Sequence, residues 1–364
     1  MPKQQTYDHL LFIVVLVLMG LGLVMVYSSS ALVAETRYQV SSYYFLKKQA
    51  LCMGLAMLVL LAAMMVPYTW WRKACYVILL ISVILLALVF FPALGKRAGG
   101  ACRWLNLSGF SFQPAEFAKL ALILYLAHFL AKKVNAIEDM KAIFLPLFIV
   151  LGVSFLLIVK QPDLGTGVVI VLIAFSLVFA AGAKKRQLFC IAGSFSLCLA
   201  GLIWLVRYRL QRILVFMNPW KDPAGTGYQM VQSFCALGGG GWFGQGLGQG
   251  IQKCGYLPEA HTDFIFSIIG EELGFIGAIA VLVLFGIFIW RGFRIARRAK
   301  DPFARWLALG ITCLIGCQAF INIGVAIGIL PTKGLPLPFI SFGGSSLIVN
   351  ALAVGMLLNI SMTV

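Results

Sequence analysis

Charged residues are scarce in this 364-residue chain, and acidic residues are scarcer than basic ones. Only 11% of the residues are Asp, Glu, Lys or Arg, 61% are hydrophobic, and 12 acidic residues stand against 29 basic ones. Together with a mean hydropathy of +0.97, this composition excludes an ordinary soluble domain. The chain also lacks a Cys-x-x-Cys pair and any Cys/His cluster, so its nine Cys and three His predict no protein-held metal or redox site.

The formal net charge of +17 would suit a nucleic-acid partner. Basic residues that flank apolar spans have a more general role, because they set the orientation of membrane proteins and contact anionic headgroups. We therefore expect membrane lipid, and no nucleic acid, as a partner. Most of the cysteines lie within apolar runs and are interpreted as small core residues. The sequence does not decide whether any two of Cys102, Cys235 and Cys254 form a disulfide.

Long apolar runs dominate the sequence. Each extends over about 18–25 residues, which is enough to cross ~30 Å of hydrocarbon as a helix, whereas a β-barrel would need short alternating segments. The sequence predicts an all-α, polytopic membrane protein, with residues 1–364 forming a single integral membrane domain. Ten transmembrane helices are expected, at 9–28, 46–66, 74–92, 115–131, 142–159, 164–182, 187–206, 263–290, 304–330 and 341–362.

Both termini are expected on the cytoplasmic side, because the number of spans is even and the short segments then placed inside are rich in Lys and Arg. The first apolar run lacks a small-residue cleavage site and is interpreted as a retained span. Most acidic residues then lie near the outer leaflet, which is where we expect the chemistry.

The longest connection, residues 207–262, is expected as an outer loop between the seventh and eighth spans. Residues 207–217 mix basic and apolar side chains, as does a helix that lies along a membrane surface. Residues 238–250 contain a formal G-x-G-x-x-G match at Gly239, Gly241 and Gly244, but no βαβ unit surrounds it. Flexible backbone beside a membrane-surface site is the preferred interpretation.

Asp263 opens the eighth span. A carboxylate near the hydrocarbon boundary is costly and is by default a functional-site hypothesis. Helix capping is the plain alternative, because Asp before an apolar helix is a common N-cap. His261 precedes Asp263, and Glu271 and Glu272 follow it, with no obvious basic partner on the same helix. A basic or metal-bound partner from another segment is therefore expected.

Three further polar clusters lie on the predicted outer side. Glu116 and Lys119 are three residues apart, so they either form an ion pair that fixes a helix or, with Arg103, offer a cation to an anionic substrate. Asp163 in Lys160–Gly165 either caps the sixth span or belongs to a site. Lys333 lies in the proline-rich stretch before the tenth span, which we expect to line a cavity.

These four stretches, in this order, resemble the SEDS (shape, elongation, division and sporulation) family of bacterial membrane proteins over essentially the whole chain. The resemblance is carried by Arg-Trp-Leu and Gln-Pro-x-Glu-Phe-x-Lys at 103–119, Gln-Pro-Asp-Leu-Gly at 161–165, His-Thr-Asp-Phe-Ile-Phe and Gly-Glu-Glu-Leu-Gly at 261–274, and Gly-Gly-Ser-Ser at 343–346. Residues 258–266 and 330–334 are more similar to the division type than to the elongation type. The sporulation type shares much of this sequence. Ala115 and Phe342 depart from the common Ser and Tyr, and each loses a hydroxyl.

The resemblance implies a peptidoglycan glycosyltransferase that polymerises lipid II into a nascent glycan strand at the outer face of the bacterial cytoplasmic membrane. The essential aspartate of the family corresponds to Asp263. Its other conserved polar positions correspond to Arg103, Glu116, Lys119, Asp163 and Lys333. The implied protein partners are a class B penicillin-binding transpeptidase and, for the division type, the divisome.

The residues suit this chemistry. A carboxylate at the outer boundary can act as a general base towards an acceptor sugar hydroxyl, and cations can stabilise a departing polyprenyl pyrophosphate. One base and a good leaving group favour a single inverting displacement. Asp263 is the expected base, Arg103, Lys119 and Lys333 are the expected cations, and Glu116 and Asp163 are expected to orient them. His261 and Glu271 complete the predicted substrate-binding set, and Mg²⁺ or Mn²⁺ is the candidate cofactor.

Two other classes of function remain open from the sequence. A lipid II flippase would use buried ionisable residues such as Glu116 and Lys119 along a translocation path. Such a path predicts polar groups in both halves of the spans, whereas this chain concentrates them on the outer side. A scaffold for the division machinery would not need costly charges inside the membrane. An elongation-type or sporulation-type enzyme is the alternative within the family.

Overall fold

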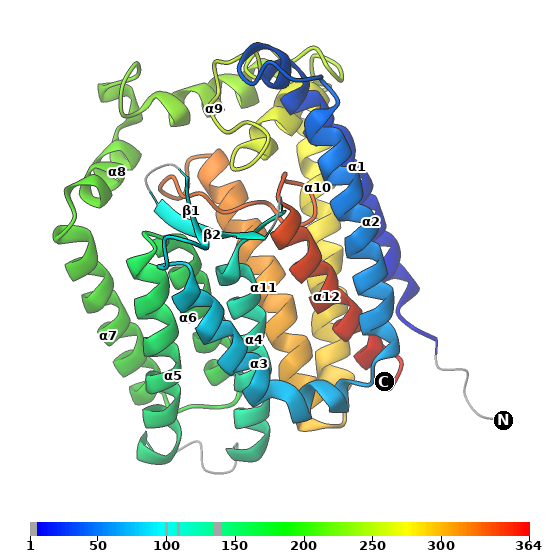
Figure 1. The fold of residues 1–364 in the computed structure, drawn as a ribbon, viewed down its shortest axis with the longest axis vertical. Coiled ribbons are helices and arrows are strands. Elements are labelled where there is room, and N and C mark those ends of the chain that lie inside the picture. The colour runs from blue at the N-terminus through cyan, green and yellow to red at the C-terminus, as the bar shows by residue number, and fades with distance from the viewer. Residues whose placement is uncertain (1–5, 99–100, 108–109, 134–139) are drawn as a thin grey trace.

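The computed structural model describes residues 6–98, 101–107, 110–133 and 140–364. Long helices stand side by side in one bundle, with smaller elements gathered over one end (Figure 1). Each of the ten expected spans coincides with a helix: α1 (His9–Thr36), α2 (Tyr44–Met65), α3 (Tyr68–Leu88), α4 (Pro114–Lys133), α5 (Met140–Lys160), α6 (Leu164–Ala180), α7 (Lys185–Trp204), α10 (Ile265–Arg298), α11 (Pro302–Ala326) and α12 (Gly344–Ser361).

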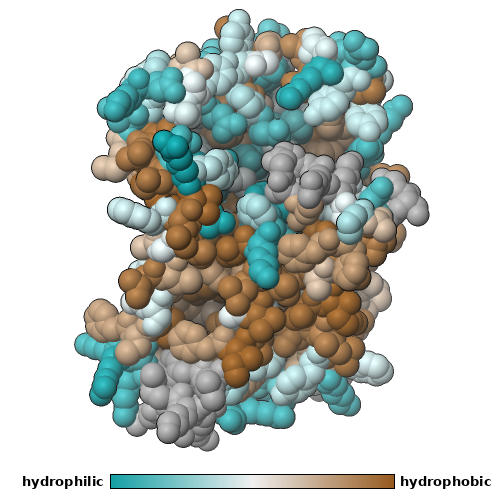
Figure 2. Space-filling model, turned by 60° about the vertical axis from the view of Figure 1, so that its left-hand side comes forward, coloured by the Kyte–Doolittle hydropathy of each residue, from teal (hydrophilic) through white to brown (hydrophobic). Residues whose placement is uncertain are grey.

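The bundle is built for a membrane. Among the described residues, eight of these helices are long and apolar enough to span a bilayer, and the apolar parts of α5 and α6 are shorter. Figure 2 shows hydrophobic side chains forming the middle of the molecule, with hydrophilic side chains at both ends. This arrangement is what a polytopic membrane protein requires, because the middle faces lipid and the ends face water. Among these eight helices, α4 is the most enclosed, because 89% of its most apolar 18-residue segment is buried.

A small antiparallel sheet departs from the all-α prediction. It consists of β1 (Gly95–Ala98), β2 (Ala101–Leu107) and β3 (Phe110–Phe112), in the order β1-β2-β3. The connection between α3 and α4 alternates polar and apolar residues, which suits strands better than a helix. Ser345 fixes the sheet to α12, because its hydroxyl donates to the Ser111 carbonyl (3.1 Å) and accepts from the Gln113 N–H (3.1 Å).

The connection between α7 and α10 contains helical segments. It contains α8 (Arg207–Met217), where a surface helix was expected, the 3₁₀ turn η2 (Pro219–Lys221) and α9 (Tyr228–Gly239). In Figure 1, α8 and α9 lie beyond the ends of α6 and α11. The Ser233 hydroxyl of α9 bonds the Ser267 hydroxyl (2.6 Å) and the Ala326 carbonyl (2.7 Å), and so fixes α9 to both α10 and α11.

Helix α10 is broken, a feature that the predicted span at 263–290 did not include. Gly274 has φ 69° and ψ −168°, which separates a half-helix, Ile265–Leu273, from a long helix that ends at Arg298. The long part runs antiparallel to α1. Ser28 of α1 bonds Glu272 (2.7 Å) just before the break, and Asp8 pairs with Arg291 (2.6 Å) near the other end.

The glycine-rich stretch is docked on this break rather than free. The N–H groups of Phe275 and Ile276 donate to the carbonyls of Gly241 (2.9 Å) and Trp242 (3.2 Å). In the other direction, the N–H groups of residues 245 and 246 donate to the carbonyls of Glu271 (3.0 Å) and Glu272 (3.0 Å). A helix break leaves such groups without partners, and an unpaired buried backbone group is costly. The glycine-rich stretch, which was expected to be flexible, is therefore ordered against the break.

We expect Gly274→Ala to destabilise the protein far more than Gly286→Ala in the same helix. A Cβ at Gly274 would overlap the backbone of Gly244 and requires a positive φ, whereas a Cβ at Gly286 meets nothing within 4 Å. The strained residue should cost about 1–3 kcal/mol before the overlap is counted. Thermal unfolding of the two variants in detergent measures the difference, and equal midpoints would contradict this view of the break.

Candidate active site at the outer end of the bundle

Asp263 lies two residues before α10 and is partly exposed. It does not cap the helix, because the N-cap residue is Phe264 and no side chain caps there. Among the described residues, none donates a hydrogen bond to the Asp263 carboxylate. The capping interpretation of this residue is therefore excluded, and its oxygens remain available for a ligand.

The backbone at Asp263 is held in place from α11. The Asn322 amide donates to the carbonyl of Asp263 (2.9 Å) and to that of Leu335 (2.7 Å). These two hydrogen bonds tie the residue to the coil between α11 and α12. Gly334 in that coil has room for no side chain, since a Cβ there would lie 2.9 Å from Asp263 Oδ2. Sequence reasoning missed Asn322, although a polar residue inside an apolar span is a signal for such a role.

The surroundings of Asp263 favour its protonated form. Its pKa is raised to about 7, chiefly by burial and then by the nearby carboxylate of Glu259, while Arg103 and Arg212 lower it and Asp163 raises it. A carboxyl whose pKa lies near neutral pH changes protonation easily in both directions. This is the property that general base catalysis needs.

Arg103 reaches the site from strand β2. Its guanidinium donates from Nε to the Gln161 carbonyl (3.2 Å) and from Nη2 to the Pro162 carbonyl. The arginine therefore fixes the sheet to the turn before α6 and brings a positive charge towards Asp263, whose pKa it lowers. Arg103 therefore lies beside the turn that carries Asp163.

Asp163 is an N-cap. Its Oδ1 accepts from the Thr166 N–H (3.2 Å) and its Oδ2 accepts from the Thr166 hydroxyl (2.8 Å), and the residue is 4% exposed. Both carboxylate oxygens are thus used inside helix α6. Its charge still acts on its surroundings, since it raises the pKa of Lys333 and of Asp263. Of the two roles that the sequence left open for Asp163, capping is observed, and membership of a site stays a prediction.

Lys333 and Arg212 complete the positive side of the site. Lys333 lies in the coil after α11 and is partly exposed, and burial lowers its pKa while Arg212 lowers it further. Arg212 comes from α8 and donates to the Thr332 carbonyl (2.9 Å). Sequence analysis placed Arg212 only in a surface helix. Its role depends on the folding of α8 back over the coil, which no local pattern reports.

Glu116 and Lys119 form an ion pair inside α4. Lys119 Nζ lies 2.7 Å from Glu116 Oε1, and each side chain is 1% exposed. The second oxygen, Glu116 Oε2, is buried without a hydrogen-bond partner in the described part of the chain. The geometry is that of the helix-fixing pair, and Lys119 presents no free ammonium in this state.

His261 is enclosed by aromatic rings. Its imidazole lies 5.1 Å from the ring of Phe45 in α2 and 5.9 Å from that of Phe342, centroid to centroid. Its carbonyl accepts from the Phe342 N–H (2.9 Å). Burial lowers the pKa of His261, so the neutral ring is favoured near pH 7. The residue fixes the segment of Asp263 against α2 and the coil before α12.

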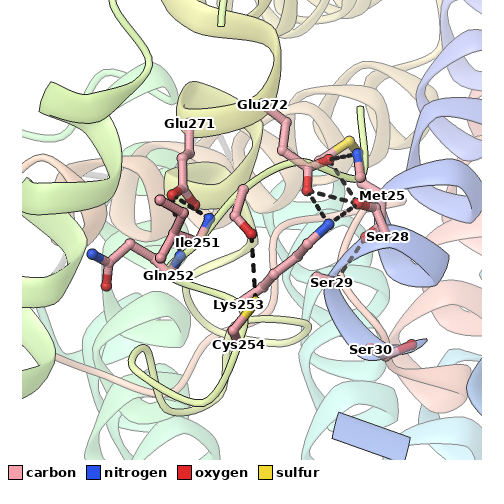
Figure 3. Close-up of polar contacts among 12 residues, drawn as sticks. Met25, Ser28, Ser29, Ser30, Ile251, Gln252, Lys253, Cys254, Glu271 and Glu272 are labelled. Carbon is pink, nitrogen blue, oxygen red and sulfur yellow. Dashed lines mark hydrogen bonds and ion pairs between the residues drawn. The ribbon is translucent and has the colours of Figure 1, made fainter. Parts of the chain in front are cut away.

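Glu271 and Glu272 contact the segment after the glycine-rich stretch (Figure 3). Glu271 accepts from the N–H groups of Ile251 (2.8 Å) and Gln252 (3.1 Å). Glu272 pairs with Lys253 at 2.6 Å. The expected basic partner from another segment therefore exists, and it serves Glu272. Within residues that the structure describes, no three His, Cys, Asp or Glu side chains are grouped as a metal site.

The fold and the site together define a polytopic helical membrane protein with a partly exposed aspartate near basic side chains at one end of its bundle. Residues 8–364 match the cell cycle protein family of FtsW, RodA and SpoVE. The chain therefore belongs to the FtsW/RodA/SpoVE family, the SEDS family to which the sequence motifs pointed.

Relatives of two types are similar to this chain over nearly its whole length. A probable peptidoglycan glycosyltransferase FtsW of Geobacter sulfurreducens is 46% identical over 98% of this chain and 95% of its own. The stage V sporulation protein E of Bacillus subtilis is 44% identical over 99% of this chain and 98% of its own.

Two solved structures are similar over their length. A chain from a peptidoglycan synthase complex that coordinates polymerization and crosslinking has a TM-score of 0.78 and 29% identity, covering 98% of this chain and 97% of that one. The crystal structure of the rod shape determining protein RodA of Thermus thermophilus has a TM-score of 0.72 and 28% identity, covering 99% and 98%.

Removing one partner of the Glu116–Lys119 pair should destabilise the protein strongly. Lys119→Met leaves a buried carboxylate without its counter-ion, which costs roughly 3–5 kcal/mol in comparable buried pairs. The double variant Glu116→Gln with Lys119→Met removes both charges and should regain much of that loss. Unfolding midpoints in detergent test this, and a double variant less stable than Lys119→Met would contradict the pairing as the main role.

Proposed function

We propose that this chain is a peptidoglycan glycosyltransferase that polymerises lipid II into glycan strands. Relatives that are named as such enzymes share its full length. The observation that carries the proposal is the Asp263 carboxylate, which is partly exposed, lacks a donor among the described residues, and has a pKa of about 7. It lies among cations that suit a diphosphate.

In the proposed reaction, the acceptor sugar hydroxyl attacks the anomeric carbon of the donor sugar. A new C–O bond forms as the bond to the polyprenyl pyrophosphate breaks, and the hydroxyl proton passes to the Asp263 carboxylate. The bond electrons leave with the pyrophosphate, and the displacement inverts the anomeric centre. Positioned proton transfer of this kind contributes typically ~10²–10⁴ in rate.

Arg103, Arg212 and Lys333 are the proposed partners of the pyrophosphate. Cations already in position stabilise the charge that develops on a leaving group. Arg103 and Arg212 lower the pKa of Asp263, and Arg212 lowers that of Lys333. Contact between Lys119 and substrate requires that its pair with Glu116 opens. Asp163 orients the cations, while His261 and Glu271 support the segments on either side of Asp263.

A divalent cation, Mg²⁺ or Mn²⁺, is proposed to enter with the substrate. A site made of protein ligands alone does not fit, because no group of three ligating side chains occurs among the described residues. Diphosphate oxygens prefer such hard cations and supply ligands themselves. Bound there, the cation would add positive charge beside the leaving group.

We further propose ten spans, cytoplasmic termini, and a site that faces outward from the bacterial cytoplasmic membrane. The excess of Lys and Arg in the short inner segments supports this orientation. A class B penicillin-binding transpeptidase and the divisome are the proposed partners, which makes septal wall synthesis the proposed role. FtsW relatives are among the most similar sequences, at 46% identity, and this favours division over sporulation.

Asp263→Asn should abolish most glycan synthesis. The amide keeps the size of the side chain but cannot accept the proton, so the rate should fall by ~10²–10⁴. The assay uses purified full-length protein with its partner transpeptidase, lipid II, and Mg²⁺, Mn²⁺ or EDTA. Glu35→Gln is the control because Glu35 is an exposed acid outside the candidate site. Wild-type yield from Asp263→Asn in every condition would remove Asp263 from the mechanism.

The rate of polymerisation should rise with pH through about 7, where Asp263 loses its proton. Glu259 raises the pKa of Asp263, so Glu259→Gln should move this acidic limb to lower pH. The linkage to stability has the opposite sign. The folded pKa lies above the ordinary value of 3.8, so the charged form is disfavoured in the folded protein and stability falls as pH rises. Asp263→Asn should therefore unfold at a higher temperature than wild type at pH 8.

A further inference from the structure

The half-helix Ile265–Leu273 connects Asp263 to the break in α10. Its first end is tied to α11 through the bond from Asn322 to the Asp263 carbonyl. Its second end carries Glu271 and Glu272. A segment of nine residues is short enough that a shift at one end moves the other, so the contacts of Glu271 and Glu272 bear on the position of Asp263.

Glu272 is the centre of a buried network. Its Oε1 lies 2.6 Å from Lys253 Nζ, and both of its oxygens accept from the Ser28 hydroxyl at 2.7 Å. Lys253 also donates to the Ser28 hydroxyl (2.9 Å), and the Gly248 N–H donates to Glu272 Oε2 (3.1 Å). Figure 3 shows Lys253 reaching across to Ser28 and Glu272. The network joins α1, α10 and the segment after the glycine-rich stretch.

Glu271 makes a second attachment on the other side of the half-helix. Its Oε1 accepts from the N–H groups of Ile251 and Gln252. Gly250 allows this close approach, because a Cβ there would lie 2.8 Å from Glu271 Oε2. Residues 248–253 are thus held by two adjacent carboxylates that point in different directions.

Stability alone does not explain the ion pair. Lys253 is 7% exposed and Glu272 is 1% exposed, so both charges lose most of their hydration. A buried pair of this kind roughly breaks even against apolar side chains of similar size, whereas its hydrogen bonds fix one geometry. What the network supplies is a defined orientation of the end of the half-helix against α1.

We propose that Glu272, Lys253 and Ser28 are positioning residues for Asp263, which hold the half-helix so that the carboxylate stays partly buried among its charged neighbours. This inference rests on the proposed function. Those neighbours come from every element around the carboxylate: Glu259 and His261 from its own segment, Arg103 from β2, Asp163 from the turn before α6, Arg212 from α8 and Lys333 from the coil after α11.

The test is the pH profile of polymerisation by full-length Lys253→Met with the partner transpeptidase. Loss of the Lys253–Glu272 ion pair admits water to Asp263 and lowers its pKa, so the acidic limb of the pH profile should move to lower pH. The kcat should fall by ~10-fold or more, the order of a lost positioning contact, while KM for lipid II stays within about twofold. Lys253→Arg keeps the cation and should restore much of the kcat. Lys221→Met makes the same change at an exposed outer lysine and should match wild type.

The outcomes separate this inference from the proposed function. If Asp263→Asn polymerises normally, the base assignment itself fails. If Asp263→Asn is inactive but Lys253→Met keeps the acidic limb of the wild-type pH profile, the network around Glu272 is only structural. The inference is then overturned, whatever the loss of yield. Should Lys253→Met not fold, Ser28→Ala removes one hydroxyl of the same network and should shift the limb in the same direction. A Ser28→Ala limb identical to that of wild type would then overturn the inference.

Discussion

The need to satisfy backbone groups at the break in α10 organises the end of the bundle that carries Asp263. An unbroken helix pairs its own N–H and C=O groups, whereas the positive φ of Gly274 leaves several of them open. The segment from Gly241 supplies the missing partners, and it can do so only where glycines allow two backbones to touch. Docking of that segment brings α9 over the end of α11 and delivers Lys253 to Glu272. A local conformational fault thus organises the layer that holds Asp263.

Burial separates the carboxylates of this protein into different tasks. Glu116 is buried beside Lys119, Glu272 is buried beside Lys253, and each forms an ion pair. Asp263 has no such partner among the described residues, and burial raises its pKa to about 7. The same functional group therefore fixes helices in one place and is the proposed base in another. For Glu272 and Asp263, tertiary structure alone decides whether a cation pairs with the carboxylate.

Local patterns in the sequence predict what local physics decides. The apolar runs that became α1 to α7 and α10 to α12, the surface helix α8, and the cap at Asp163 follow from length, periodicity and residue type. The break at Gly274 was missed because a glycine inside an apolar run is usually tolerated in a helix. The role of Arg212 and the pairing of Lys253 with Glu272 depend on chain segments that meet only after folding. The small sheet was missed because its alternation is short.

Asp163 and Asp263 show how one sequence signal has two outcomes. Each is an aspartate just before an apolar helix, and each has a capping interpretation. Asp163 is followed three residues later by Thr166, whose N–H and hydroxyl occupy both carboxylate oxygens. At Asp263 the helix begins at Ile265 after Phe264, one residue too late for the carboxylate to be the cap. Asn322 of α11 holds the Asp263 carbonyl, so a residue of another helix helps to fix the backbone from which this carboxylate stays free for a ligand.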